Sequence, residues 1–204
     1  MVKPSKGRAS DGGNEVLDRL FAAIDCWDPQ LAERAVRVSR TVSLLARDMG
    51  MSIAETSSLE SAARVYDLGM LGIPADLRRN SGSNLEAKKL LRTHVTVVER
   101  ILGKTASGGP SLRLPLEMAA SHHERWDGGG YPQGLGGDAI PQAARMVAVA
   151  EALDLLVNPE KGNPGLPVEE AVAEVTRHAR FAFDPAITDA LQRAAIGKEL
   201  LVAT

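Results

Sequence analysis

The apolar residues of this chain recur at the three- and four-residue spacing of helices, and helix-capping residues divide them into segments. Asp28 is a candidate N-cap, because Pro29 follows it at what would be the first helical position. Gly50 follows the last apolar residue of the same segment, where a helix commonly ends. The pattern therefore predicts a long helix over residues 31–49.

Helix-start signals recur further along the chain. Ser52 with Glu55, and Ser83 with Glu86, have the three-residue spacing of a capping box. Asp184 precedes a proline, as Asp28 does. These positions predict the beginnings of three more helices.

No segment alternates apolar and polar residues with period two over a useful length, so nothing indicates strands. The pattern predicts an all-α fold of about seven or eight helices with one long glycine-rich loop over residues 128–137. Hydrophobic residues make up 44% of the chain but aromatic residues only 3%, which favours packed helices over a β-sandwich. Residues 1–13 are mostly polar, so we expect a flexible tail there and a single domain over residues 14–204.

The charge of the chain is close to balanced. A formal net charge of −2 and a pI near 6.1 leave no basic footprint for a nucleic-acid polymer, so that partner is excluded. No apolar run is long enough to cross a bilayer, and no secretory signal follows the N-terminus. Cys26 is the single cysteine and cannot form an internal disulfide. We expect a cytoplasmic protein without a membrane partner, whose ligand is a small acidic molecule or a protein.

Candidate chemistry is concentrated in residues 122–141. His122 and His123 are adjacent at the end of a helical segment, where their side chains point about 100° apart and can bind one ion or two neighbouring ions. His94 also lies in a segment with acidic residues, whereas His178 stands apart. The glycines that follow the histidine pair allow positive φ or close approach of the backbone to a ligand. These features together indicate a binding site rather than an unstructured connection.

The segment that begins at His122 reads His-His-Glu-Arg-Trp-Asp-Gly-Gly-Gly-Tyr-Pro and continues to Ala144-Arg145. It resembles the signature of the HD-GYP family, a branch of the HD superfamily of metal-dependent phosphohydrolases that hydrolyses the bacterial messenger cyclic di-GMP. The resemblance covers about residues 30–193 and implies the helical bundle of that superfamily. It assigns metal ligation to five residues: Asp67, His94, His122, His123 and Glu151.

Besides Glu151, which stands where the family has an aspartate, five positions depart from the family pattern, namely Gln30, Arg34, Tyr66, Met70 and Asn158. The resemblance implies a histidine where Tyr66 stands, and a phenol is a poor ligand near neutral pH because its pKa is near 10. Arg34 replaces a second histidine, and a guanidinium cannot ligate a cation. Gln30 stands where some members have a glutamate ligand, Met70 replaces a lysine, and Asn158 replaces an arginine.

The losses fall on one of the two metal ions that the resemblance implies. The first ion keeps only Asp67 and Glu151, which is one methylene longer than the family's aspartate. The second ion keeps Asp67 with the three histidines, a set suited to zinc, iron or manganese. We therefore expect no metal or one divalent transition metal. Our hypothesis is that the guanidinium of Arg34 replaces the missing cation and pairs with Asp67 or Glu151.

The resemblance also implies ligand and partner contacts. Arg145 and Lys161 remain as candidate phosphate-binding residues. The loop residues Gly128, Gly130, Tyr131 and Pro132 match the segment implicated in docking onto diguanylate cyclase (GGDEF) domains, and family members often form homodimers.

These observations support a degenerate HD-GYP domain that is catalytically weak or inactive and acts in cyclic di-GMP signalling by binding a ligand or a protein. The alternative is an active metal-dependent phosphodiesterase that hydrolyses cyclic di-GMP or a linear dinucleotide with a reduced metal site. A third interpretation is a helical scaffold retained for dimerisation.

Overall fold

The computed structural model describes residues 12–79, 85–106, 112–159 and 164–197, and these ranges contain helices, turns and loops but no strand. The α-helices are α1 (Gly12–Trp27), α2 (Pro29–Asp48), α3 (Ile53–Ala63), α4 (Ala75–Arg79), α5 (Leu85–Leu91), α6 (His94–Ala106), α7 (Arg113–Ser121), α8 (Gln142–Val157), α9 (Val168–Arg177) and α10 (Pro185–Ile196). Two 3-10 helices, η1 (Leu68–Gly72) and η3 (Gly137–Ala139), are also present. The predicted all-α fold is confirmed, and eight of these α-helices have nine or more residues.

The predicted caps form where their residues are described. The Asp28 carboxylate accepts a hydrogen bond from the Leu31 N–H at 3.2 Å, so the predicted cap is confirmed, and α2 begins at Pro29, two residues before the predicted range. Ser52 and Glu55 form a complete capping box at the start of α3. Asp184 accepts from the backbone N–H of α10 at 2.8 Å. The second predicted capping box begins outside the described residues.

The first helix starts slightly earlier than the sequence suggested. The sequence predicts a tail that ends at residue 13, and α1 begins at Gly12. Residues 1–11 lie outside the described ranges. None of the described helices combines the length and apolar character needed to cross a lipid bilayer.

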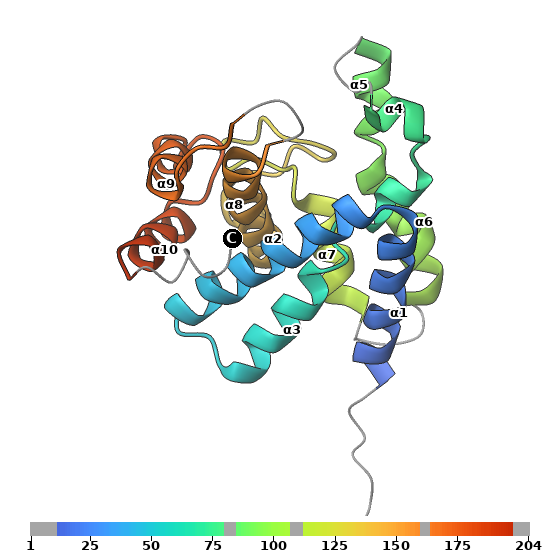
Figure 1. Cartoon of the computed structure of the whole chain (residues 1–204), viewed down its shortest axis with the longest axis horizontal. Helices are drawn as coiled ribbons and strands as arrows, with labels where there is room; N and C mark the ends of the chain where they lie inside the picture. Colours follow the sequence, from blue (N-terminus) through green and yellow to red (C-terminus); the bar gives the residue numbers. More distant parts are fainter. Residues whose placement is uncertain (1–11, 80–84, 107–111, 160–163, 198–204) are drawn as a thin grey trace, which may run out of the picture.

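The larger of two apolar cores lies around the crossing of α2 and α8. Figure 1 shows α2 across the middle of the molecule, with α3 packed beside it and α9 and α10 at one end. Leu45 on α2, Met146 and Leu153 on α8, and Leu191 on α10 are fully buried in this core. Tyr66 belongs to the same cluster, so its ring is part of the packed interior.

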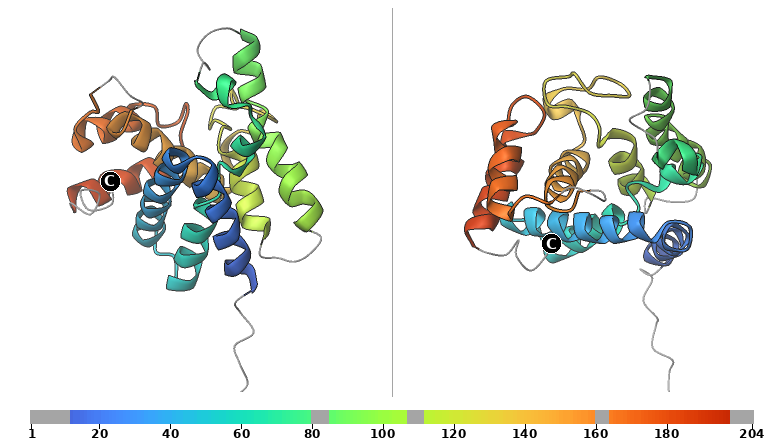
Figure 2. Two further views of the ribbon diagram at one scale, coloured as in Figure 1. Left: turned by 45° about the vertical axis from the view of Figure 1, so that its right-hand side comes forward. Right: turned by 45° about the horizontal axis from the view of Figure 1, so that its top comes forward.

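The second core lies at the N-terminal end of α2, between α1, η1, α6 and α7 (Figure 2). Ile24, Leu68, Val98 and Leu102 form its centre, and Met70 packs against them. Gly69 on η1 lies against the first residue of α6, and a Cβ there would be only 1.9 Å from the carbonyl oxygen of His94. This close approach brings η1, and Asp67 just before it, next to the start of α6.

Candidate metal centre

Three histidines from two helix ends meet in the interior. His94 begins α6, His122 is the C-cap of α7, and His123 follows it. Their candidate ligand atoms all lie within 4.8 Å of one another. His178, which the sequence set apart, is exposed at the end of α9 and lies 3.3 Å from a carboxylate oxygen of Glu174. The structure therefore groups the same three histidines that the sequence singled out.

Backbone hydrogen bonds determine how two of these rings face the site. His94 Nδ1 lies 2.7 Å from the Leu91 carbonyl oxygen, and His122 Nδ1 lies 3.0 Å from that of Ala119. Since a carbonyl only accepts, each Nδ1 carries the hydrogen, and in the neutral ring Nε2 presents a lone pair. Burial lowers the pKa of His94, as does the neighbouring His122, although Asp67 opposes the shift. The His94 ring is therefore neutral near pH 7, the form in which an imidazole can ligate a metal ion.

The two Nε2 atoms face each other and a buried carboxylate. They are 3.4 Å apart, and Asp67 Oδ1 lies 3.5 Å from the first and 3.8 Å from the second. Asp67 Oδ1 is buried and has no hydrogen-bond donor among the described residues. Three acceptor atoms thus converge without a donor between them, which is costly unless a cation is bound.

His123 is the fourth candidate metal ligand. Burial lowers the pKa of its ring, as do the two other histidines and Arg92, so the ring is neutral and offers a lone pair to a metal ion. One carboxylate with three imidazoles fits a single zinc, iron or manganese ion. The residues Asp67, His94, His122 and His123 would hold such an ion.

Glu151, the fifth residue predicted as a ligand, has a different partner. It lies on α8, and its carboxylate accepts a hydrogen bond from the Tyr66 hydroxyl at 3.0 Å. Burial raises the pKa of Glu151, with Asp67 adding to the shift and His122, Arg34 and Tyr66 opposing it. Burial also raises the pKa of Tyr66, as do the two carboxylates, so the phenol stays protonated and acts as a donor.

Arg34 is half-buried on α2 and lies within the electrostatic reach of the same groups. Burial alone would lower its pKa, but the acidic groups Tyr66, Asp67, Glu151 and Asp154 outweigh it and raise the pKa above its ordinary value. A permanent positive charge therefore acts on both carboxylates. Its direct pairing with Asp67 or Glu151 stays a prediction.

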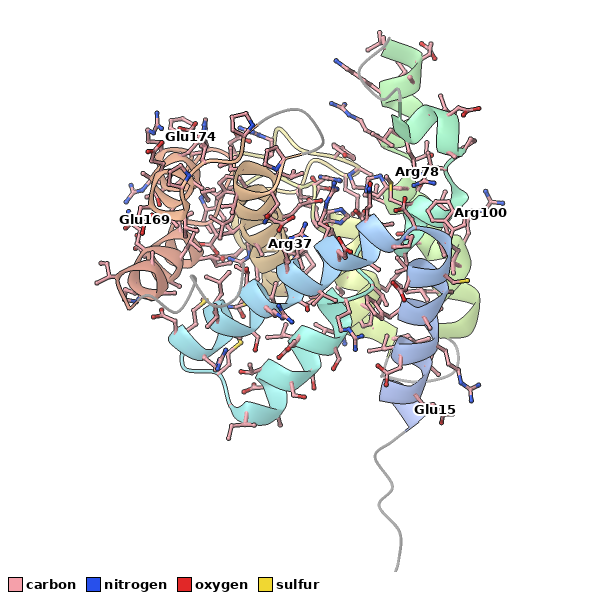
Figure 3. The ribbon with its side chains drawn as sticks, in the orientation of Figure 1. Glu15, Arg37, Arg78, Arg100, Glu169 and Glu174 are labelled. Carbon is pink, nitrogen blue, oxygen red and sulfur yellow. The ribbon has the colours of Figure 1, made fainter. Side chains whose placement is uncertain are left out.

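The remaining substituted positions lie away from the histidines or on the surface. Gln30 is exposed near the start of α2. Asn158 is the C-cap of α8 and donates a hydrogen bond to Asp154 Oδ1 at 3.0 Å. The same buried carboxylate pairs with Arg37 on α2, the residue labelled in Figure 3. Nε and Nη2 of Arg37 lie 2.6 and 3.1 Å from the two carboxylate oxygens. Asn158 thus contributes to a buried ion pair between α2 and α8.

Arg145, predicted to bind phosphate, is engaged by carboxylates of the chain. Its Nη1 lies 3.0 Å from Asp138 and 2.5 Å from Asp184, and its side chain is only 14% exposed. Its guanidinium also lies over the Trp126 ring. These contacts connect the glycine-rich loop to the start of α10, so a phosphate role for Arg145 stays a prediction. Lys161, the other predicted phosphate ligand, lies outside the described residues.

The glycine-rich loop is held by a residue that the sequence analysis missed. Glu124 is buried, and its carboxylate accepts hydrogen bonds from the backbone N–H groups of Gln133 and Leu135 at 2.7 and 3.0 Å. An acidic residue four positions before a run of glycines was the available signal, since loop amides need acceptors. Gly130 is packed so tightly that a Cβ there would lie 2.4 Å from the backbone nitrogen of Arg125.

The loop is also tied to a turn near the C-terminal helix and to the histidines. Trp126 and Asp127 donate backbone hydrogen bonds to the carbonyls of Ala182 and Phe181 at 3.1 and 2.8 Å. The ring of Tyr131 stacks on His123, with centroids 4.8 Å apart and planes at 23°. The Tyr131 to Pro132 peptide bond is cis. The Gly-Tyr-Pro segment therefore lies directly against the candidate metal centre.

Comparison with known proteins agrees with this geometry. The sequence profile of the family described as HD domain matches residues 20–187. The chain belongs to the HD domain family. It is 33% identical to a cyclic di-GMP phosphodiesterase of Thermotoga maritima over 86% of this chain and 48% of that protein. A cyclic di-GMP phosphodiesterase response regulator of Xanthomonas campestris is 32% identical over 93% of this chain and 50% of its own length. These relatives and the Gly-Tyr-Pro loop place the chain in the HD-GYP branch, and it spans about half the length of the curated relatives it matches.

Solved structures share the fold at lower sequence identity. An HD-GYP-type protein of Bdellovibrio bacteriovorus superposes with a TM-score of 0.66 at 20% identity, covering 92% of this chain and 62% of the other. A cyclic GMP-AMP-specific phosphodiesterase of Vibrio cholerae has the same TM-score at 19% identity, covering 92% of this chain and 50% of the other. The HD-superfamily fold expected from the sequence is thereby confirmed.

Proposed function

We propose that this chain is a degenerate HD-GYP domain that binds cyclic di-GMP, or a closely related cyclic dinucleotide, beside one divalent ion and hydrolyses it weakly or not at all. It acts in signalling by binding its ligand or a protein. The observation that carries the proposal is the hydrogen bond from Tyr66 to Glu151. Both residues stand at positions that the family resemblance assigns to the ligands of a first metal ion. Here they form a hydrogen bond with each other instead.

The electrostatics around this pair support a single ion. The raised pKa of Tyr66, caused first by burial, keeps the phenol protonated, so it donates to Glu151 instead of ligating. The charge of Arg34 acts on Asp67 and Glu151 from α2. A second divalent cation beside a guanidinium would be repelled. The four residues Asp67, His94, His122 and His123 remain to hold one ion.

Weak hydrolysis follows from the charge that is missing. A bound divalent ion polarises a phosphoryl oxygen and orients the ligand, and two ions act together on the attacking and leaving oxygens. Single electrostatic contributors to transition-state stabilisation are each worth about 3 to 4 kcal/mol, so losing one cation lowers the rate by about 100- to 1,000-fold. Arg34 supplies a positive charge, but a guanidinium cannot coordinate a water molecule as a metal ion does. Met70 supplies no charge.

The alternative is a working hydrolase with one metal ion. It is favoured by the intact convergence of Asp67 Oδ1 with the Nε2 atoms of His94 and His122. Its ligand would be cyclic di-GMP or a linear dinucleotide. The two proposals differ in turnover and agree in metal content.

Metal analysis and calorimetry separate these proposals. Protein loaded with Mn²⁺, Fe²⁺ or Zn²⁺ and then desalted is analysed for metal, titrated with cyclic di-GMP, and assayed for turnover by chromatography. The matched variants are His123→Ala, which removes a ligand, and His178→Ala, an exposed histidine outside the cluster. We expect about one ion per chain in the wild type and in His178→Ala, less in His123→Ala, and binding without appreciable turnover.

Three outcomes would contradict the leading proposal. Two ions per chain would show that Tyr66 and Arg34 do not exclude the first ion. Rapid turnover that is lost in His123→Ala would favour the one-metal hydrolase. A metal-loaded wild type that fails to bind cyclic di-GMP would leave only protein partners.

The protein partners of this domain follow from the family resemblance. A diguanylate cyclase (GGDEF) domain would dock on the Gly-Tyr-Pro loop, where Pro132 is exposed. A homodimer is the other proposed assembly. Sedimentation of the chain alone and with a GGDEF domain measures both.

A further inference from the structure

An arginine that neither the sequence analysis nor the family positions singled out lies beside the candidate metal centre. Arg92 occupies the short link between α5 and α6, two residues before His94. Its backbone N–H donates to the Lys88 carbonyl at 3.1 Å, which continues the helical path of α5 into the link. The side chain is exposed. A positively charged group thus reaches solvent from the segment that supplies one of the histidines.

The side chain of Arg92 is positioned by an aromatic ring. Its guanidinium carbon lies 4.8 Å from the centroid of the Tyr131 ring, within the range of a cation–π contact. The same tyrosine stacks on His123 with centroids 4.8 Å apart. Tyr131 therefore contacts both the guanidinium and a candidate metal ligand, so Arg92 lies one ring away from the metal centre.

Arg92 differs from other arginines near the site in its partners. Arg37 and Arg145 form ion pairs with carboxylates of the chain. No carboxylate among the residues that the structure describes forms an ion pair with Arg92. The Tyr131 ring contacts the guanidinium group, whereas the five N–H donors lie in the guanidinium plane. These donors are therefore available to an anion from solvent.

We propose that Arg92 binds a phosphate oxygen pair of a phosphodiester ligand, with Tyr131 holding the guanidinium in place. This inference rests on the proposed function, because it names a contact for the ligand of that site. A planar guanidinium matches the geometry of phosphate and binds it in bidentate fashion. The contact with a ring reduces the side-chain freedom that binding would otherwise cost. A lysine has the charge but neither the planar fork nor the same stacking.

Calorimetric titration of the metal-loaded protein with cyclic di-GMP tests the proposal, and inorganic phosphate serves as a second probe. The variants are Arg92→Ala and Arg92→Lys. Arg100→Ala is the matched control, because Arg100 is an exposed arginine on the neighbouring α6 that extends away from the molecule (Figure 3). Each variant is also analysed for metal and for its thermal midpoint, which shows whether the centre and the fold are intact.

We expect Arg92→Ala to raise the dissociation constant by about 10-fold or more, as loss of a charge-assisted hydrogen-bonded pair does. Arg92→Lys should recover only part of this loss, and Arg100→Ala should stay close to the wild type. Metal content should be unchanged in all of them. Equal affinities in Arg92→Ala and the wild type would overturn the inference while leaving cyclic di-GMP binding established.

The second probe distinguishes failure of this inference from failure of the proposed function. If the wild type binds phosphate but not cyclic di-GMP, the proposed ligand is wrong, and weaker phosphate binding by Arg92→Ala still supports the assigned contact. If the wild type binds neither probe, the inference is overturned together with the proposed function. An equal loss in Arg100→Ala would indicate a non-specific charge effect and would also overturn it.

Discussion

Replacing Tyr66 with phenylalanine tests the hydrogen bond on which the proposed function depends. The change removes only the hydroxyl that donates to Glu151 at 3.0 Å. The ring keeps its edge-to-face contact with His122, with centroids 5.2 Å apart, and its place in the larger core. Glu151 is 8% exposed, so water cannot readily replace the lost donor. The substitution therefore isolates one buried hydrogen bond.

The size of the effect follows from the burial of the acceptor. A hydrogen bond to a charged group contributes about 1.5 to 3 kcal/mol, and an unsatisfied buried acceptor costs a similar amount. We expect Tyr66→Phe to lower the free energy of unfolding by about 2 kcal/mol. For a chain of this size each kcal/mol shifts the thermal midpoint by about 2 to 4 °C, so the expected decrease is about 4 to 8 °C.

The loss should also depend on pH. Burial raises the pKa of Glu151 above its ordinary value of 4.5, so the folded state holds the proton more tightly than the unfolded chain. Stability from this group is therefore complete below pH 4.5 and decreases as the pH rises through the folded pKa. The Tyr66 hydroxyl lowers that pKa, and its removal raises it further. The destabilisation by Tyr66→Phe should accordingly be larger at pH 8 than at pH 4.

Urea unfolding and thermal melts of the two variants Tyr66→Phe and Tyr131→Phe measure these effects. Tyr131 is the other of the two tyrosines, and its hydroxyl has no hydrogen bond among the residues that the structure describes. It therefore provides the same chemical change without the bond. Equal stability losses in both variants, or a Tyr66→Phe effect that shrinks as the pH rises, would refute the reasoning.

Three further predictions concern the loop and the core. Arg37→Ala should cost about 3 kcal/mol by urea unfolding, because it leaves the buried Asp154 carboxylate without its bidentate partner; Arg40→Ala, exposed on the same helix, is the control. Gly130→Ala should lower metal content by elemental analysis, because its Cβ would meet the Arg125 backbone nitrogen at 2.4 Å and displace the loop beside His123. A hydrogen bond from Arg125 lowers the pKa of Asp127 from 3.8 to about 2, so its contribution is present above pH 3.8 and lost as the pH falls to about 2. The difference in thermal midpoint between wild type and Asp127→Asn should therefore shrink as the pH falls from 3.8 to about 2.

Each of these predictions has an outcome that would contradict it. Equal stabilities of the Arg37 and Arg40 variants would show that the pair with Asp154 is not a net stabilising interaction. Unchanged metal content in Gly130→Ala would mean that the loop tolerates a Cβ without moving the histidines. A difference for Asp127→Asn that does not shrink between pH 4 and pH 2 would exclude protonation of Asp127 as its cause.

The helix starts could be predicted because their determinants are local. Asp28, Ser52 and Asp184 each cap backbone groups two or three residues away, so the signal lies within one turn of sequence. The histidine cluster was also predicted, but through the Gly-Tyr-Pro signature and not through geometry. Periodicity alone contains no information that the start of α6 and the end of α7 lie at the same point.

The parts that could not be predicted depend on residues far apart in the chain. Tyr66 and Glu151 are 85 residues apart in the sequence. Each replaces a family metal ligand, and no local pattern indicates that the two side chains form a hydrogen bond. From the sequence, Arg145 is a candidate phosphate-binding residue. Its ion pair with Asp184, 39 residues away, is evident only in the structure. Arg92 carries no local signal, because an exposed arginine beside a helix start is common on any surface.

The ties between the glycine-rich loop and the turn before α10 determine when this site can form. The carbonyls of Phe181 and Ala182 that accept from Asp127 and Trp126, and the carboxylate of Asp184 that pairs with Arg145, are all synthesised long after the loop itself. A chain emerging from the ribosome can pack α2, α3, α7 and α8 before these anchors exist. The ties to residues 181–184 form only after those residues are made, so a nascent or prematurely ended chain would have a loop held by Glu124 but not yet joined to the turn before α10.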